Sequence, residues 1–452
     1  MRTRLVLLGL VGALGCGGDD GAADGGDPRD AESILLTIDG DALVMPLEAT
    51  MLVASVAPAG PNDGASVRWD VRSSTAELAC DDVVELTQDG LNASLTIPAV
   101  GDARCRDELV VRATLTLADR TVTAEHRVEV TLPEGYGRTW TPDDDNPVLA
   151  LDTCPTWSCL GHTDPAFYER PDGSTELWFS AGGDRGEFPV VGVGELVDGR
   201  VVSPRLILFP DPDADPRPWD HARETVNVVR DGERALMTYL GYAISYFDDP
   251  SIGVAHSDDG ATWERTAAPV YTPSRPDGWD ASFISGPMAL RGSDGRWRLY
   301  YGGASTRSLG GKIGVLLSDD GESWTPHPAN PVFANRVGEW DESVIDAHVV
   351  FAGGRYLMWH TGWVEPLTQD SRISIGLAES EDGIEWTRVS NEPVLTPGET
   401  GAWNDTSVVS PSIRVEADGS LMMAVHGTST VRPVPTSPEF RPERVGIFRS
   451  AP

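Results

Sequence analysis

Short runs of alternating apolar and polar residues fill the region from residue 32 to residue 133. Alternation with a period of two places one face of a strand in a core, and Gly, Asp, Asn and Pro separate the runs. About seven strands in about 100 residues are typical of an immunoglobulin-like β-sandwich. No catalytic constellation is visible here, so we expect a spacer, with a glycan- or protein-binding module as the alternative. The runs are Ile34–Ile38, Met51–Val56, Val67–Val71, Val83–Leu86, Ser94–Ile97, Leu109–Leu117 and Arg127–Leu132.

Residues 136–452 contain an internal repeat. Three segments of the form I-G-x-x-x-S-x-D-G-x-x-W end at Trp263, Trp324 and Trp386, which are 61 and 62 residues apart. Each is followed by a Pro-Val pair, then by a tryptophan before Asp or Asn, and then by two further strands. The second of these strands occurs five times, at residues 177–182, 236–241, 299–304, 357–362 and 421–427.

Four short strands in each repeat of about 61 residues predict a β-propeller, here with five blades. The chain ends after the third strand of the fifth repeat, and residues 138–149 match the fourth strand of an earlier one. We therefore expect the N-terminal strand to close the ring. The predicted fold is all-β, with the sandwich at 32–133 followed by the propeller at 136–452. Equivalent positions on the inner strands are assigned to Asp164, Glu224, Gly286, Asp346 and Ser410.

The first residues have the pattern of an export signal. Arg2 and Arg4 precede an apolar run, and small residues precede Cys16, which resembles a bacterial lipoprotein signal. The resemblance implies a signal at residues 1–15, a lipid on Cys16 and a tether at 16–31; a plain secretory signal is the alternative. We expect a protein anchored by lipid in the bacterial cell envelope, at the outer membrane or cell surface.

Four cysteines follow the lipidation site, and an even number in an exported protein suggests two disulfides. Proximity in the sequence pairs Cys80 with Cys105 and Cys154 with Cys159. A zinc site is the rival interpretation, but no CxxC spacing or histidine pair accompanies these residues. No metal and no cofactor are therefore predicted.

The chain is strongly acidic, with 70 Asp and Glu against 35 Lys and Arg and a net charge of −35. A field of this sign repels phosphate backbones and anionic lipids. We therefore exclude nucleic acid as a partner and expect membrane contact only through the N-terminal lipid.

The sequence His-Thr-Asp164-Pro165 on the first inner strand, together with the S-x-D-G-x-x-W turns, resembles the arabinanase–fructosidase type of five-bladed glycoside hydrolase. In that family an Asp is base or nucleophile, a second Asp positions substrate and adjusts a pKa, and a Glu is the general acid. The resemblance gives the first role to Asp164. The chain departs from the pattern at Gly286, where the second Asp is expected, and at Asp346, where the Glu is expected.

Glycosidic cleavage needs one protonated acid and one carboxylate, and clustered acids raise one another's pKa. Asp164, Glu224 and Asp346 share one repeat position, so they are the candidate catalytic residues, with Glu224 or Asp346 as the acid. The alternative is that they are solvated ends of inner strands.

Several residues in the same register are candidates for substrate binding. Histidines there could donate protons or, with the acids, hold a cation. Tryptophans that precede inner strands could stack on a sugar or pack between blades, whereas Trp263, Trp324 and Trp386 are assigned to packing. The substrate-binding candidates are His162, Arg223, His348, His360 and Trp279.

The predicted function is that of an exported glycoside hydrolase-like lipoprotein that acts on an extracellular oligo- or polysaccharide. Asp258-x-Gly260-x-Thr262-Trp263 also resembles the turn of sialidase propellers, but those have six blades. The second alternative is a surface glycan-binding or scaffold lipoprotein with a degenerate site, and Gly286 is its main support.

Overall fold

The computed structural model describes the chain in segments. Every regular element in these segments is a strand, which confirms the all-β prediction. No helix in them is long and apolar enough to cross a membrane. The predicted signal and tether, Cys16 and all four disulfide candidates lie outside the described residues. Those residues are 35–40, 43–44, 49–57, 66–73, 84–96, 108–117, 121–130, 132–149, 161–182, 189–208, 216–232, 234–243, 250–273, 277–292, 294–305, 310–368, 371–416, 418–430 and 443–451.

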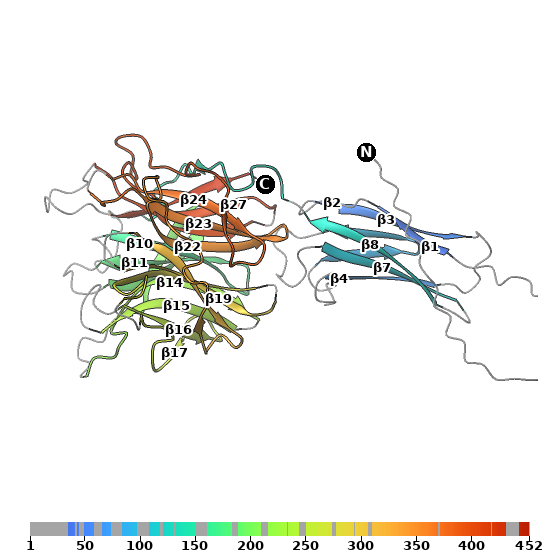
Figure 1. Ribbon diagram of the computed structural model, residues 1–452, viewed down its shortest axis with the longest axis horizontal. Helices are drawn as coiled ribbons and strands as arrows, with labels where there is room; N and C mark the ends of the chain where they lie inside the picture. Colours follow the sequence, from blue (N-terminus) through green and yellow to red (C-terminus); the bar gives the residue numbers. More distant parts are fainter. Residues whose placement is uncertain are drawn as a thin grey trace, which may run out of the picture.

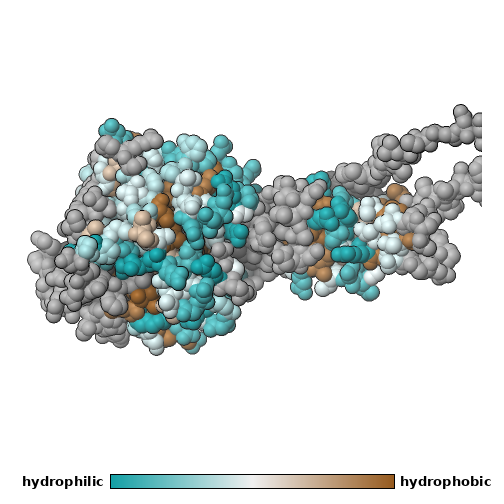
Figure 2. All heavy atoms as spheres, turned by 90° about the horizontal axis from the view of Figure 1, so that it is seen from below, coloured by the Kyte–Doolittle hydropathy of each residue, from teal (hydrophilic) through white to brown (hydrophobic). Residues whose placement is uncertain are grey.

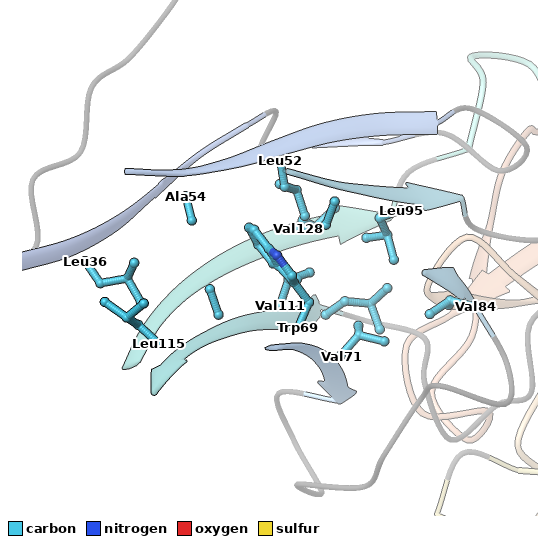
Figure 3. Packing of buried hydrophobic residues seen from close by; sticks show 13 residues of the cluster. Leu36, Leu52, Ala54, Trp69, Val71, Val84, Leu95, Val111, Leu115 and Val128 are labelled. Atoms are coloured by element: carbon cyan, nitrogen blue, oxygen red, sulfur yellow. The ribbon is translucent and has the colours of Figure 1, made fainter. Parts of the chain in front are cut away.

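Two four-stranded sheets form the N-terminal region, and each of the seven predicted runs overlaps one of their strands. Their facing sides share one apolar core, in which Trp69 is 3% exposed (Figure 3). Its indole Nε1 donates a hydrogen bond to the Gly90 carbonyl (3.1 Å), which joins the two sheets. One sheet has the order β1 (Leu35–Asp39), β3 (Ala49–Ala57), β6 (Asn92–Thr96), β5 (Glu85–Asp89), and the other β2 (Leu43–Val44), β8 (Thr121–Val130), β7 (Glu108–Thr116), β4 (Ser66–Ser73).

Five further four-stranded antiparallel sheets are the blades of a propeller (Figure 1). The innermost strands are β10, β14, β18, β22 and β26, each followed outward by the next strands of its own blade. The blades consist of β10 (Gly161–Glu169), β11 (Thr175–Gly182), β12 (Pro189–Val197), β13 (Arg200–Leu208); β14 (Ala222–Asp231), β15 (Arg234–Tyr242), β16 (Ser251–Ser257), β17 (Glu264–Arg265); β18 (Phe283–Arg291), β19 (Trp297–Ala304), β20 (Lys312–Ser318), β21 (Thr325–Pro326); β22 (Ser343–Ala352), β23 (Arg355–Trp363), β24 (Ser374–Ser380), β25 (Thr387–Arg388); and β26 (Val409–Val415), β27 (Leu421–Gly427), β28 (Arg444–Ser450), β9 (Thr141–Pro142).

The fifth blade closes the ring as predicted, because β9 from the start of the propeller pairs with β28 at its end. The Asn146 side chain strengthens this closure. Its Nδ2 donates to the Ile447 carbonyl and its Oδ1 accepts from the Ile447 N–H, both at 2.7 Å. Closure places blade five beside blade one, so residues far apart in the sequence meet at the central axis.

The repeated turns explain the repeated sequence. In the first turn the Ser257 hydroxyl accepts from the Gly260 N–H (2.8 Å), and Asp259 accepts from the two following N–H groups. The same bonds recur at Ser318 and Ser380. The tryptophans that end these motifs pack against other aromatic side chains, as Trp263 does on Trp178 of the preceding blade. Their predicted packing role agrees with this arrangement.

The segment between the two N-terminal sheets and the propeller is held to the propeller by a hydrogen bond and by apolar packing. The Tyr136 hydroxyl donates to the Gly419 carbonyl (2.8 Å), and Leu132 packs against the apolar core of blades four and five. Hydrophilic residues cover much of the described surface in Figure 2, in line with the excess of charged and polar side chains.

Candidate active site

A β-bulge interrupts each of the five inner strands at an equivalent place. The pairing register with the second strand shifts there, and one residue takes a positive φ. Residues other than glycine rarely adopt positive φ, and a bulge redirects a side chain. We call these five residues the bulge ring: Asp164 (φ 49°), Thr225 (52°), Gly286 (52°), Asp346 (47°) and Ser410 (52°).

The bulge ring lines a cavity at the central axis. The cavity has a volume of about 340 Å³ including its opening to solvent. Each blade contributes three consecutive residues, beginning with its member of the ring, so the lining follows the fivefold repeat. These residues are 164–166, 225–227, 286–288, 346–348 and 410–412.

Asp164 and Asp346 lie in the ring as the repeat predicts, but the assignment of Glu224 is wrong by one residue. Thr225 has the positive φ and lines the cavity. Glu224 is not among the residues that line the cavity. It is 4% exposed and accepts a hydrogen bond from the Tyr242 hydroxyl at 2.6 Å.

One hydroxyl connects the two aspartates of the ring. Ser410 Oγ lies 3.0 Å from Asp164 Oδ1 and 2.8 Å from Asp346 Oδ2. The second oxygen of Asp346 accepts from the Ser285 hydroxyl (2.8 Å), and the second oxygen of Asp164 accepts from Thr163 (2.9 Å). Both carboxyl groups are therefore held in fixed orientations, by Ser410 and Ser285 of adjacent blades and by Thr163 of the same strand as Asp164.

Burial and mutual repulsion set the charge of this cluster. Burial, with a smaller contribution from the charge of Asp164, raises the pKa of Asp346 to about 6. Asp346 is 8% exposed. His426 on β27 accepts the Asp164 N–H at Nδ1 (3.1 Å), so its ring is neutral with the proton on Nε2. Burial lowers the pKa of His426, and Asp164 opposes this effect.

A third carboxyl group beside Asp164 was not predicted. Glu443, the residue before β28, accepts the His162 N–H with its backbone carbonyl (3.0 Å), which places it over the start of β10. Burial, and secondly the charge of Asp164, raises the pKa of Glu443 to about 7. Its side chain is only partly buried. Glu443 directly precedes the third strand of its blade, so the repeated motifs of the inner strands do not point to it.

Packing explains why blade three carries no acid. A Cβ atom at Gly286 would lie 2.5 Å from Asp346 Oδ1 and 2.8 Å from Asp346 Cα. No side chain fits there unless Asp346 moves. Asp346 therefore occupies the space that an acid on blade three would need.

Only one of the five predicted substrate-binding residues lines the cavity. His348 lies in its wall and hydrogen-bonds with the Ile413 backbone, and burial lowers its pKa to about 4. His162 is fully buried against Phe179 (ring centroids 5.3 Å apart), and burial lowers its pKa to about 4. His360 is buried and stacks on Trp340 at 5.8 Å.

The other two predicted binding residues also have packing partners, and Trp279 is only partly buried. Arg223 is 6% exposed and forms an ion pair with Asp220 at 3.1 Å. Trp279 packs on Tyr301 with 5.5 Å between ring centroids, and Gly314 leaves room for its indole. Packing is thus the alternative that the geometry favours for Trp279. Within the described segments, no group of three or more His, Cys, Asp or Glu side chains is arranged to hold a metal ion.

Comparisons with known proteins give weak sequence matches. No family model matches the chain. Uncharacterized protein Rv1502 of Mycobacterium tuberculosis is 27% identical over 174 residues, which are 37% of this chain and 54% of that protein. Uncharacterized protein MT1551, from another strain, matches equally. The chain spans about half the length of the curated relatives it matches.

Solved structures give a clear match to the propeller. A structure described as a complex of BT0996 and RGII has a TM-score of 0.53 and 18% identity, covering 66% of this chain and 90% of its own. A second, described as a glycoside hydrolase, has a TM-score of 0.51 and 18% identity, covering 65% and 89%. A family 117 glycoside hydrolase of the marine bacterium Zobellia galactanivorans has a TM-score of 0.50 and 12% identity, covering 69% and 89%. The chain thus shares its fold with solved glycoside hydrolase structures, which agrees with the fold that the sequence resemblance implies.

Proposed function

We propose that the protein is a glycoside hydrolase that cleaves glycosidic bonds in an extracellular carbohydrate. The observation that carries this proposal is the pair of carboxyl groups that line the axial cavity, Asp164 and Asp346 joined through Ser410, together with Glu443, whose pKa the charge of Asp164 helps to raise. Two carboxyl groups in different protonation states are what glycoside hydrolysis requires.

We assign the proton donor to Glu443 and not to Asp346. Both oxygens of Asp346 already contact hydroxyl groups, those of Ser285 and Ser410, and the residue is almost fully buried. Glu443 is partly exposed, and its pKa of about 7 keeps part of it protonated near neutral pH. A general acid must reach the leaving oxygen, so the more accessible group suits this role better.

The chemistry then divides between two residues. As the bond between the anomeric carbon and the glycosidic oxygen breaks, its electron pair stays on the oxygen, which takes the proton of Glu443. Asp164 either bonds to the anomeric carbon or removes a proton from the water that does so. Asp346 holds Asp164 in place through Ser410.

We also propose that the protein is exported, is anchored through a lipid on Cys16 and carries the disulfides Cys80–Cys105 and Cys154–Cys159. The sandwich is proposed to be immunoglobulin-like. In that fold the sheets have the strand orders ABED and CFG, which correspond to β1-β3-β6-β5 and β4-β7-β8. Trp69 is buried on the strand that corresponds to C, as in immunoglobulin domains. Such a module would act as a spacer.

A non-catalytic glycan-binding lipoprotein is the second candidate. The absence of an acid at Gly286, where the family pattern has one, favours it. This candidate predicts sugar binding without release of products.

Reducing-sugar release on a panel of plant and microbial polysaccharides that includes arabinans and fructans tests the proposal. The purified protein and Asp164→Asn are compared, with retardation in gels that contain each polysaccharide as the binding measurement. We expect release by the wild type and none by the variant. Binding by both proteins without release of sugar would support the second candidate, and release by Asp164→Asn would contradict the assignment of Asp164.

A further inference from the structure

The contact between Ser410 and the two aspartates has one hydrogen too few if both carboxyl groups are ionised. A serine hydroxyl carries a single hydrogen and can donate to one acceptor at a time. Its oxygen nevertheless lies within hydrogen-bond distance of Asp164 and of Asp346, at 3.0 and 2.8 Å. The second contact is a hydrogen bond only when a carboxyl group supplies the hydrogen.

In the part of the chain that the structure describes, the groups around the pair supply hydroxyl hydrogens but no positive charge. Ser285 donates to Asp346, Thr163 to Asp164, and Thr225 approaches Asp164 Oδ2 at 3.4 Å. In the described segments neither aspartate forms an ion pair with an arginine or lysine.

The described titratable side chains next to the pair likewise add no positive charge to offset the two carboxylates. Nδ1 of His426 already accepts the Asp164 N–H, and Glu443 adds a third acidic group. His348, two residues after Asp346, bonds to the Ile413 backbone, and burial keeps it neutral. Among the described residues, a proton is therefore the species that compensates the pair, in agreement with the hydrogen that the Ser410 contacts require.

We propose that Ser410 joins Asp164 and Asp346 into one unit that holds a single proton and passes it between the two carboxyl groups. In one form Asp346 Oδ2–H donates to Ser410 Oγ, and Ser410 Oγ–H donates to Asp164 Oδ1. In the other form the Asp346 O–H bond has broken as a new Oγ–H bond formed, and the original hydroxyl proton has moved to Asp164. The charge moves from Asp164 to Asp346, and no atom is gained or lost.

The consequence for catalysis rests on the proposed function. With the proton on Asp346, Asp164 is ionised and can act as base or nucleophile without a second negative charge beside it. Ser410 and Asp346 are then positioning residues that act through Asp164, and they need not touch the substrate.

Carboxyl ¹³C NMR of the full protein labelled at aspartate tests the proton sharing without any substrate. Asp164→Asn and Asp346→Asn assign the two signals, and each is followed as a function of pH in the wild type, Ser410→Ala and Ser410→Thr. We expect both wild-type signals to move in the same two steps, as coupled groups do. In Ser410→Ala each signal should follow mainly one step of its own, and Ser410→Thr should restore the shared steps.

Separate single steps in the wild type, or shared steps that persist in Ser410→Ala, would overturn the proposal. Thermal melting shows whether Ser410→Ala folds, and Ser410→Thr keeps the hydroxyl if it does not. If the wild type shares the proton but releases no sugar, the proton sharing stands and the proposed hydrolase activity fails.

Discussion

The bulge ring contains two arcs that differ in chemistry although their backbones are alike. All five members have φ between 47° and 52° and sit at equivalent bulges. On blades four, five and one the members are Asp346, Ser410 and Asp164, which contact one another. On blades two and three they are Thr225 and Gly286. The fold therefore supplies the same backbone five times, and the chemistry arises where Asp346, Ser410 and Asp164 occupy three adjacent copies.

We call Asp346, Ser410 and Asp164 the reactive arc. Closure of the ring brings these three residues together. Asp164 and Ser410 are 246 residues apart in the sequence and meet because β9 completes the blade that contains β28. The other arc serves packing, since Gly286 leaves room for Asp346 and Thr225 makes only a long contact to Asp164. Substitutions in the two arcs should therefore have different effects, on activity in the first arc and on stability in the second.

Glu443→Gln should cause a large loss of activity. Removing a general acid costs about 10²- to 10⁴-fold in kcat. Because a good leaving group needs no proton, much of this loss should be recovered on aryl glycosides with a nitrophenol leaving group. Rates on both substrate types measure the difference. An equal loss on both would contradict a role for Glu443 as proton donor.

The next prediction concerns the stability of the protein and Gly286, a member of the arc on blades two and three. Gly286→Ala adds a Cβ against Asp346 at a positive φ, whereas Gly295→Ala adds one at φ 77° with no atom within 4 Å. Strain at positive φ costs about 1–2 kcal/mol in both variants, and the clash adds roughly 1–3 kcal/mol in the first. Chemical denaturation should show Gly286→Ala to be less stable than Gly295→Ala. Equal losses would mean that Asp346 moves aside freely.

A smaller effect should appear in the pH dependence of stability. Because the pKa of Asp346 is raised to about 6 in the folded state, from roughly 3.9 when unfolded, its protonation favours folding. This contribution is complete below about pH 4 and is lost as pH rises through 6. The unfolding free energy of the wild type relative to Asp346→Asn should fall by roughly 2 to 3 kcal/mol between pH 4 and pH 7. A constant difference would show that Asp346 titrates normally.

The strands and the propeller were predictable because each depends on local patterns repeated along the chain. The motifs that end at Trp263, Trp324 and Trp386 mark equivalent turns, and the match of residues 138–149 to an earlier repeat identifies the closing strand. These signals need no knowledge of side-chain direction.

The site was only partly predictable. The ring positions are not separated by a constant number of residues, and an acidic residue directly precedes the ring position of blade two, so the repeat alone assigned Glu224 where Thr225 faces the cavity. His162 was a candidate because it lies two residues before Asp164, and His360 because it lies on a second strand. Both side chains are buried, and position in the sequence does not tell which face of a strand a side chain takes. Glu443 precedes β28, the third strand of its blade, so the repeat of the inner strands does not predict its position near Asp164.

The comparison of the two arcs is tested most directly by sugar release from Asp164→Asn and Thr225→Val, measured together on one substrate of the wild type. Valine keeps the shape of threonine and removes only its long contact to Asp164. The account predicts that Asp164→Asn loses about 10²-fold or more of the wild-type rate and that Thr225→Val stays within about threefold. Equal losses in both variants, or full activity in Asp164→Asn, would contradict it.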